Sequence, residues 1–153
     1  MRVSAKVDYA VRAALELAAV GDDGPVKGER LAEAQDIPLQ FLEHILLDLK
    51  RAGIVRTKRG ARGGYWLAQP ASSVTVADII RAVEGPLATV HGEPAEDIDY
   101  PGGSEPMREV WLALRANIRQ VLESVTLADV VAGSLPEPIG TLARHPEAST
   151  QRD

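Results

Sequence analysis

The chain of 153 residues contains no cysteine, and aromatic residues make up only 4% of it. The absence of cysteine excludes disulfides, thiolate metal sites and cysteine-ligated iron–sulfur clusters. No apolar run approaches the ~20 residues that a membrane span requires, and no stretch resembles a signal peptide. We therefore expect a cytoplasmic protein with a core of Leu, Val, Ile and Ala, and no membrane partner.

The sequence also lacks the patterns that mark common enzyme sites. It has no Gly-rich phosphate loop after a strand, no nucleophile elbow and no paired-carboxylate signature. His44 and His145 show no catalytic pairing. The stretch from 87 to 105 contains metal-ligand residue types such as His91 and Glu93, but their spacing matches no defined metal site. We therefore expect no enzyme activity, no metal and no other cofactor.

Acidic residues outnumber basic ones, and the formal net charge is −5. The imbalance is uneven: residues 1–69 carry 11 Lys and Arg against 9 Asp and Glu, whereas residues 70–153 carry 6 against 13. The first part is therefore +2 and the second −7. A locally basic surface can bind nucleic-acid phosphates although the whole chain is anionic, so the charge leaves a nucleic-acid binder open.

The first 52 residues predict three helices. Apolar residues recur at helical spacing over residues 4–20, where Ser4 is a suitable N-cap, and again over 26–35. A third helix is expected from Pro38 to Ala52, with Pro38 in the first turn, where a missing N–H costs little. Two short helices separated by a three-residue break are typical of a helix-turn-helix.

A β-hairpin with a basic surface is predicted directly after the third helix. Residues 54–58 and 64–68 are strand-like, and a glycine-rich turn lies between them. Between positions 50 and 67 there are no acids and six cations, namely Lys50, Arg51, Arg56, Lys58, Arg59 and Arg62. Glycines let a main chain approach a DNA backbone, and cations displace counterions from phosphates. We interpret the hairpin as the wing of a winged helix-turn-helix; a solvated hairpin with incidental charge is the alternative.

Polar residues near the start of the third helix are candidates for reading bases. The apolar stripe of this helix leaves Gln40, Glu43 and His44 on the opposite face. Gln40 can pair with adenine, Glu43 can accept from cytosine N4, and His44 can donate. The alternative is that they form the wet face of an ordinary amphipathic helix. Tyr65 and Trp66, next to the hairpin turn, are expected to pack against the helices rather than to stack on bases.

More helices are expected in the second half of the chain, after a linker. Thr75 and Asp78 form a capping-box pattern that opens the first of them. The loop that follows is rich in Gly, Pro and acids, and we expect it to be partly disordered. The predicted elements are, in order, a helix over about 75–84, a loop over 87–105, a helix over about 105–124, a short helix from Thr126 to near Gly133, and a tail from Ser134.

The long helix carries a heptad-like apolar seam whose members are spaced 4, 3, 4, 3 and 4 residues apart. They are Met107, Trp111, Leu114, Ile118, Val121 and Val125. Such seams are more often ordinary core than a subunit interface, and the pattern covers fewer than three heptads. Because the first 85 residues already form a complete small domain, little core of the same chain is left for this helix to cover. We therefore predict that it holds a homodimer together.

The residues resemble the Rrf-two family of bacterial transcriptional regulators over about positions 1–132. The combination is specific, although no single piece is. The matching stretches are 1–6 (MRVSAK), 9–13 (YAVRA), 30–33 (RLAE), 41–46 (FLEHIL), 49–55 (LKRAGIV), 59–60 (RG), 62–65 (RGGY), 75–85 (TVADIIRAVEG) and 126–130 (TLADV). The resemblance implies a mainly α fold, in which a winged helix-turn-helix domain with a small β-hairpin is joined to a long C-terminal dimerisation helix.

The resemblance also implies a homodimeric transcriptional regulator, expected to be a repressor, that binds double-stranded DNA at a palindromic operator. Positions 40, 43 and 44 fall on the family's recognition-helix contacts and Arg59 on its wing contact, while Ser4 and Lys6 would lie near the DNA backbone. The predicted DNA-binding residues are Ser4, Lys6, Gln40, Phe41, Glu43, His44, Lys50, Lys58, Arg59, Arg62 and Gly63. Pro38 replaces a capping Ser that is usual in the family, which would shift the start of the helix.

The sequence departs from the cluster-binding members of this family. Those members carry three cysteines in the loop that corresponds to residues 91–105, and this chain has none. Asp8 matches the position of a cluster-ligating aspartate, but it cannot hold a cluster alone. We therefore expect a regulator without an iron–sulfur cluster, whose effector is an unknown small molecule or a protein.

These patterns predict four parts: a DNA-binding domain over 1–85, an acidic effector or linker loop over 86–104, the dimerisation helix and a short final helix over 105–133, and a flexible tail over 134–153. Two other functions stay open. The acidic second half also fits an adapter whose winged helix binds protein and not DNA. A small-molecule enzyme would require a buried, polar-lined cleft with perturbed ionisable groups.

Overall fold

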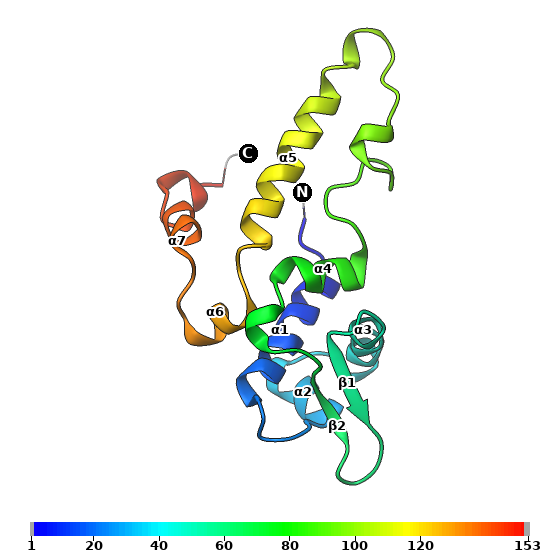
Figure 1. The fold of residues 1–153 in the computed structure, drawn as a ribbon, viewed down its shortest axis with the longest axis vertical. Coiled ribbons are helices and arrows are strands. Elements are labelled where there is room, and N and C mark those ends of the chain that lie inside the picture. The colour runs from blue at the N-terminus through cyan, green and yellow to red at the C-terminus, as the bar shows by residue number, and fades with distance from the viewer. Residues whose placement is uncertain (1, 152–153) are drawn as a thin grey trace.

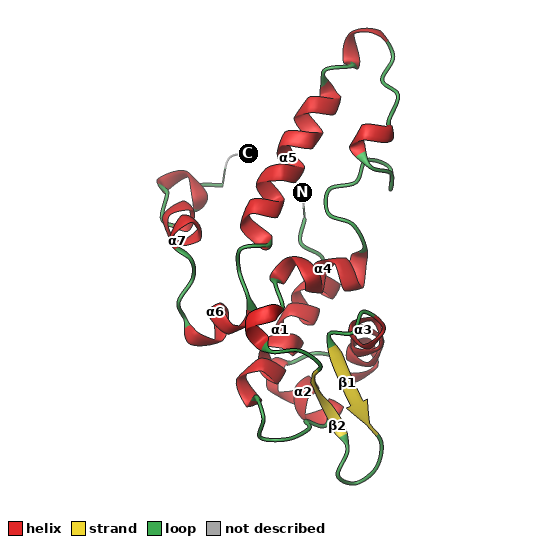
Figure 2. Ribbon diagram, in the orientation of Figure 1, coloured by secondary structure: helices red, strands yellow, loops and turns green. Residues whose placement is uncertain are grey.

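The computed structural model describes residues 2–151. Figure 1 shows a helical domain with a hairpin at one end and a long helix, α5, rising from the other. The helices dominate Figure 2, and the described chain has one sheet of two antiparallel strands. The helices and strands are α1 (Ala5–Val20), α2 (Gly28–Gln35), α3 (Leu39–Arg51), β1 (Val55–Lys58), β2 (Gly64–Leu67), α4 (Val76–Glu84), α5 (Met107–Leu122), α6 (Leu127–Ala132) and α7 (Glu137–Ala143). The predicted mainly α fold with a small hairpin is confirmed.

Helix α1 is the centre of the core. It packs against α2, α3, α4 and α6 as well as β2. Its inner face contains three fully buried alanines, Ala10, Ala13 and Ala14, and such small side chains let the neighbouring helices approach closely. The neighbours contribute larger apolar residues, each of which stabilises the fold by about 1.5–3 kcal/mol when it leaves water. The largest fully buried side chains include Leu31, Leu42, Ile45, Leu46, Leu49, Ile79 and Leu127.

The turn between α2 and α3 sets the angle of the helix-turn-helix. Asp36 adopts a left-handed conformation with a φ of 51°, which ends α2. The next residue, Ile37, is buried, and its amide donates to the carbonyl oxygen of Ala32 over 2.9 Å. The sequence places Pro38 in the first turn of α3, but the structure places it one position earlier, at the N-cap. Its side chain makes no capping hydrogen bond. The apolar Ile37 therefore fastens the turn to the core.

The capping box that the sequence predicts before α4 forms, a second capping box lies before α6, and the two meet each other. Thr75 and Asp78 close the start of α4, and Thr126 and Asp129 close the start of α6. The two starts pair as an isolated antiparallel bridge between Thr75 and Thr126, flanked by main-chain hydrogen bonds of 3.0 and 2.9 Å. Helix α6 is thereby tied to the N-terminal helical domain.

This pairing corrects two expectations about the second half. Val125 follows the end of α5 and is buried in the domain, so it is not part of a seam on the long helix. Leu127 of α6 is fully buried in the same core. The division that placed residues 105–133 outside the domain is therefore wrong for Val125 and α6. In Figure 1, α5 and its preceding loop extend away from the domain, as does α7.

The acidic loop is folded along α5. It forms two short 3-10 turns, at Ala95–Asp97 and Gly102–Ser104. Ala95 is fully buried. Arg115 of α5 lies 2.8 Å from Glu96, and Arg108 donates to the carbonyl oxygen of Ile98 over 2.8 Å. The expectation of partial disorder is therefore wrong, because two arginines of α5 supply partners for the Glu96 carboxylate and the Ile98 carbonyl oxygen of the loop.

The predicted tail also contains regular structure. Helix α7 covers Glu137–Ala143, and a 3-10 turn follows at Pro146–Ala148. Pro138 lies in the first turn of α7, where its fixed φ suits a helix and its missing N–H costs little. Residues 152 and 153 of the predicted tail lie outside the described residues. No helix within residues 2–151 is both long and apolar enough to cross a bilayer.

Candidate nucleic-acid interface

The outer side of α3 presents a row of polar side chains. Its buried stripe consists of Leu42, Ile45, Leu46 and Leu49. This stripe turns Gln40, Glu43 and His44 outward, and all three are exposed. Nδ1 of His44 lies 2.8 Å from the carbonyl oxygen of Gln40. Because a carbonyl can only accept, Nδ1 is the donor, and the outward Nε2 of the neutral ring is an acceptor. The expectation that His44 donates to a base is therefore corrected for the neutral ring.

Phe41 links the same helix to α1. Its ring meets Tyr9 edge-on, with centroids 5.5 Å apart and an interplanar angle of 80°. The guanidinium of Arg12 lies over the Tyr9 ring, 4.8 Å from its centroid. The same guanidinium donates to the carbonyl oxygen of Gln35 at the end of α2. Phe41 is still 37% exposed. It therefore positions α3 and also shows an apolar edge beside Gln40.

The tip of the hairpin is built from glycines. Strands β1 and β2 pair antiparallel, from Val55 opposite Leu67 to Lys58 opposite Gly64. The amide of Gly63 donates to the carbonyl oxygen of Gly60 over 2.9 Å and closes the turn. A Cβ at Gly63 would lie 1.9 Å from the carbonyl oxygen of Lys58. Glycine is thus required at position 63 for steric reasons, and its predicted place in the interface is at the wing tip.

Four of the six cations between positions 50 and 67 make neither an ion pair nor a cation–π contact within residues 2–151. These four exposed residues, which we call the open cations, are Lys50, Lys58, Arg59 and Arg62. The other two are occupied. Arg51 lies 3.9 Å from Asp48, and Arg56 stacks over the Trp66 ring at 5.5 Å. The open cations leave a positive surface at the end of α3 and at the wing, which suits nucleic-acid phosphates.

Two residues before α2, which are not among the predicted site residues, hold the wing in place. Val26 pairs with Tyr65 of β2 through main-chain hydrogen bonds of 2.8 and 2.7 Å. The ammonium of Lys27 donates to the carbonyl oxygen of Gly60 at the tip over 2.6 Å. Tyr65 packs against the core as expected. The β-branched Val26 just before the second helix was the available signal for this isolated bridge to β2.

Ser4 and Lys6 connect helices within the chain. Ser4 caps α1, and its hydroxyl donates to a carboxylate oxygen of Glu84. The ammonium of Lys6 lies 2.8 Å from a carboxylate oxygen of Asp48 and donates to the carbonyl oxygen of Val83 over 2.9 Å. Its charge is therefore already balanced, and a phosphate would have to compete with Asp48. A DNA contact by either residue stays a prediction.

Comparison with known proteins decides the family. A model of the Rrf2 family (the Rrf-two family named above), described as an iron-dependent transcriptional regulator, matches residues 3–133. The chain belongs to the Rrf2 family. It is 48% identical to the HTH-type transcriptional regulator Rv1287 of Mycobacterium tuberculosis over 143 aligned residues. The alignment covers 94% of this chain and 89% of that protein.

Solved structures of Rrf2-type regulators have the same fold. CymR, the global cysteine regulator of Bacillus subtilis, superposes with a TM-score of 0.74 at 32% identity, over 88% of this chain and 98% of that chain. IscR of T. potens gives a TM-score of 0.69 at 33% identity, over 100% of this chain and 94% of that chain. This Rrf2 protein is therefore a DNA-binding transcriptional regulator with a winged helix-turn-helix.

The iron dependence in the family description does not fit the residues of this Rrf2 protein. It has no cysteine to ligate a cluster. Within residues 2–151, no group of three or more His, Cys, Asp or Glu could hold a metal ion. In the loop, Glu96 is bound instead by arginine: a backbone hydrogen bond and the Arg115 guanidinium keep the pKa of Glu96 below its ordinary value. Asp8 is likewise paired with Arg12 at 3.1 Å.

Proposed function

We propose that this Rrf2 protein is a cytoplasmic repressor that acts as a homodimer on a palindromic operator, without an iron–sulfur cluster. The observation that carries the proposal is the continuity of two surfaces. The polar row of α3 and the open cations belong to adjacent elements, since α3 leads directly into β1. One surface offers groups that read bases, and the other offers charges that hold phosphates.

The polar row would enter the major groove. The amide of Gln40 matches the N6 and N7 edge of adenine, and the carboxylate of Glu43 matches the N4 donor of cytosine. The Nε2 acceptor of His44 can take a hydrogen bond from either of these exocyclic amino groups. Lys50 lies at the end of the same helix, where it would meet the backbone. Because carboxylates repel phosphates, Glu43 would act mainly by rejecting wrong bases.

The wing would lie along the backbone and the adjacent minor groove. Lys58, Arg59 and Arg62 are exposed around the glycine tip, and arginine is favoured in a narrow minor groove. The tip would be held at a fixed angle to α3 by Lys27, which binds the Gly60 carbonyl oxygen. A wing that is anchored at its tip loses less conformational freedom on binding than a mobile one.

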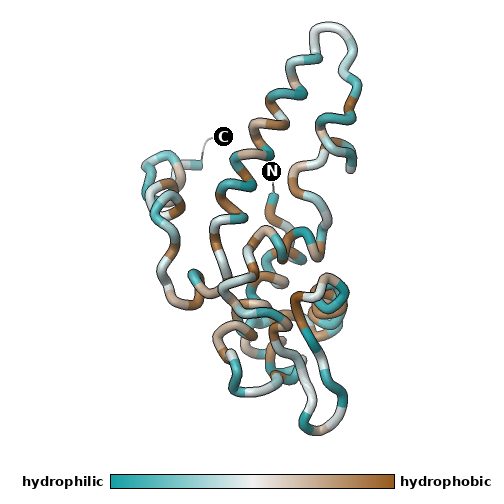
Figure 3. The backbone as a smooth tube through the Cα atoms, viewed as in Figure 1, coloured by the Kyte–Doolittle hydropathy of each residue, from teal (hydrophilic) through white to brown (hydrophobic). Residues whose placement is uncertain are grey.

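Dimerisation would be the task of α5. None of the 16 residues of this helix is fully buried in its own chain, although some are half-buried. Brown and teal segments alternate along it in Figure 3, which shows its amphipathic character. Met107 is 37% exposed, Leu114 38% and Val110 50%. Val110 was absent from the predicted seam, which also included Val121, here half-buried. An uncovered apolar stripe on an ordered helix favours association with a second copy.

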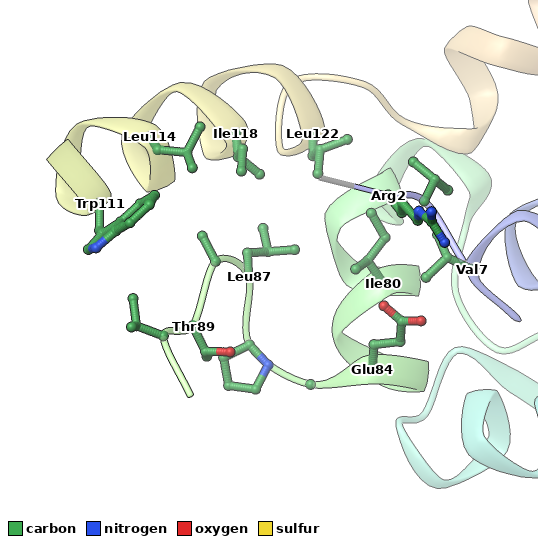
Figure 4. A pocket seen from close by; sticks show the side chains of 15 residues that line it. Arg2, Val7, Ile80, Glu84, Leu87, Thr89, Trp111, Leu114, Ile118 and Leu122 are labelled. Atoms are coloured by element: carbon green, nitrogen blue, oxygen red, sulfur yellow. The ribbon is translucent and has the colours of Figure 1, made fainter. Parts of the chain in front are cut away.

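A groove beside α5 supports the same proposal. Trp111, Leu114 and Ile118 project from α5 toward Leu87 on the segment after α4 (Figure 4). The groove has a volume of about 660 Å³ and is open to solvent. Its walls are mainly apolar, with Arg2 and Glu84 at the domain end. Part of the predicted seam therefore faces a groove that the chain itself leaves unfilled, and a second copy would cover it.

Selection of genomic DNA fragments with the purified protein tests the proposal. We expect an enriched motif with two inverted half-sites, bound by two chains in sedimentation equilibrium. A reporter behind the selected promoter should be less active when the protein is present. Enrichment of an asymmetric site by single chains would contradict the homodimer, and increased reporter activity would contradict repression. No salt-sensitive DNA affinity at all would instead favour a protein-binding adapter.

A further inference from the structure

Helix α3 also carries an exposed leucine on the face that is proposed to read DNA. Leu47 is 42% exposed. It belongs neither to the buried core nor to the partly buried residues packed against that core. Its position follows from the helical repeat, because residues three and four apart lie on one side of a helix. Leu47 is therefore in line with Glu43 and His44, one turn closer to the end of α3.

The neighbours of Leu47 favour a contact with DNA over a contact with another partner. On its N-terminal side lie the polar side chains of Gln40, Glu43 and His44. On its C-terminal side, one turn later, lies the open cation Lys50. From Gln40 to Leu47 the helix rises by ~10 Å, at ~1.5 Å per residue. This span corresponds to about three base pairs at a spacing of ~3.4 Å. Any DNA that contacts both the start of α3 and Lys50 must therefore pass Leu47.

We infer that Leu47 is a specificity-determining residue that packs against a pyrimidine 5-methyl group in the major groove. The inference rests on the proposed DNA contact of α3. A leucine side chain can neither donate nor accept a hydrogen bond, and the C5-methyl group of thymine is the apolar feature on the major-groove edges of the standard base pairs. The same methyl group occurs on 5-methylcytosine. Leu47 therefore selects a methylated pyrimidine, beside the bases that the polar row reads.

The test removes the methyl group from the DNA and the apolar surface from the protein. In one half-site of the selected operator, each thymine is replaced in turn by deoxyuridine, and the affinity is measured for the wild type and for Leu47→Ala. At one position we expect the wild type to lose about fourfold in affinity, which corresponds to the burial of one methyl group. Leu47→Ala should bind the thymine and deoxyuridine operators equally. The same thymine is also replaced by cytosine and, in a second operator, by 5-methylcytosine. Comparison of these two operators shows whether the methyl group alone increases the affinity of the wild type.

Two further variants separate recognition from folding. Leu47→Met keeps an apolar side chain of similar size and should keep the methyl effect, whereas Leu47→Gln should lose it. Because Leu47 is exposed, all three variants should unfold at nearly the wild-type temperature. An operator that is bound with the same methyl dependence by wild type and Leu47→Ala would overturn the role of Leu47 alone. Failure of the wild type to enrich any sequence would overturn the proposed function as well.

Discussion

Helices α3 and α5 are both amphipathic, but they differ in how much of their apolar face is buried within the chain. Of the 13 residues of α3, four are buried in the core, and its outer face is mainly polar. Of the 16 residues of α5, none is buried, and its uncovered residues include Met107, Val110 and Leu114. The apolar face of α3 is therefore satisfied within the chain, whereas the apolar face of α5 is not.

The difference shows what each helix has left to bind. The outer face of α3 can offer hydrogen bonds and charge, which suits the edges of base pairs and the phosphates beside them. The uncovered face of α5 can offer mainly hydrophobic contact, which suits a second copy of the same helix. We therefore propose that α3 serves DNA recognition and α5 serves self-association, so variants in one helix should leave the function of the other intact.

The largest expected effect is a loss of stability from the core of α3. Leu46 is fully buried, so Leu46→Ala should lower the free energy of unfolding by ~2–5 kcal/mol through lost burial and the cavity left behind. Leu114→Glu on α5 should change the stability of the monomer far less, because that side chain is 38% exposed. Denaturant unfolding of both variants measures the contrast.

Leu114→Glu should instead act on association. We expect it to shift the mass in sedimentation equilibrium toward one chain and to remove the dependence of the unfolding temperature on protein concentration. Ala116→Glu is the matched control, since position 116 is also exposed but lies on another side of α5. Equal dissociation by both variants, or by neither, would break the proposed division between the two helices.

The next largest effect is expected at the wing. Removing two open cations with Arg59→Ala and Arg62→Ala should weaken binding to specific and non-specific DNA alike. The slope of log affinity against log salt should fall by about 2, at ~0.9 per lost phosphate contact. Arg144→Ala is a suitable control because this arginine is exposed but lies beyond α7. An unchanged salt slope in the double variant would show that the wing does not touch the backbone.

A smaller and more selective effect is expected from the polar row. Gln40→Ala should relax the preference at one base position by ~1–3 kcal/mol, because a bidentate contact to adenine is lost. Affinity for non-specific DNA and its salt slope should stay near the wild-type values. The measurement is a comparison of the motifs selected from a random DNA library by the two proteins. An identical motif would remove Gln40 from the set of base-reading residues.

The sequence predicted the parts of this architecture that local patterns determine. The boundaries of α1 and α4 follow from apolar periodicity and from caps at Ser4 and Thr75, and the glycine tip of the wing follows from steric demand at Gly63. These features depend on residues that are close together in the sequence, so a short stretch of sequence is enough to predict them. The fold class and the exposed faces of α3 were accessible for the same reason.

The parts that sequence reasoning missed depend on contacts between distant segments. Val26 and Lys27 hold the wing from a position far before it. The pairing of Thr75 with Thr126 returns α6 to the core, although the two capping boxes share a pattern that hinted at equivalent helix starts. Lys6, a predicted DNA-backbone contact, lies beside Asp48 of another helix, so a phosphate would have to compete with that carboxylate. Charge in a sequence shows no partner, and only the fold reveals which cations are left open.

The smallest expected effect concerns the contact that ties α5 to its own loop. A backbone hydrogen bond and Arg115 lower the pKa of Glu96 below its ordinary value of 4.5. A lowered pKa means that folding favours the carboxylate, so the contact is fully present above pH 4.5 and is lost as the pH falls through the lowered value. Fluorescence of Trp111, in a Trp66→Phe background, should report a slight loosening of the loop below pH 4.5. Glu96→Gln should lack this transition; if it persists, another carboxylate holds the loop against α5, and the contrast with α3 must include that contact.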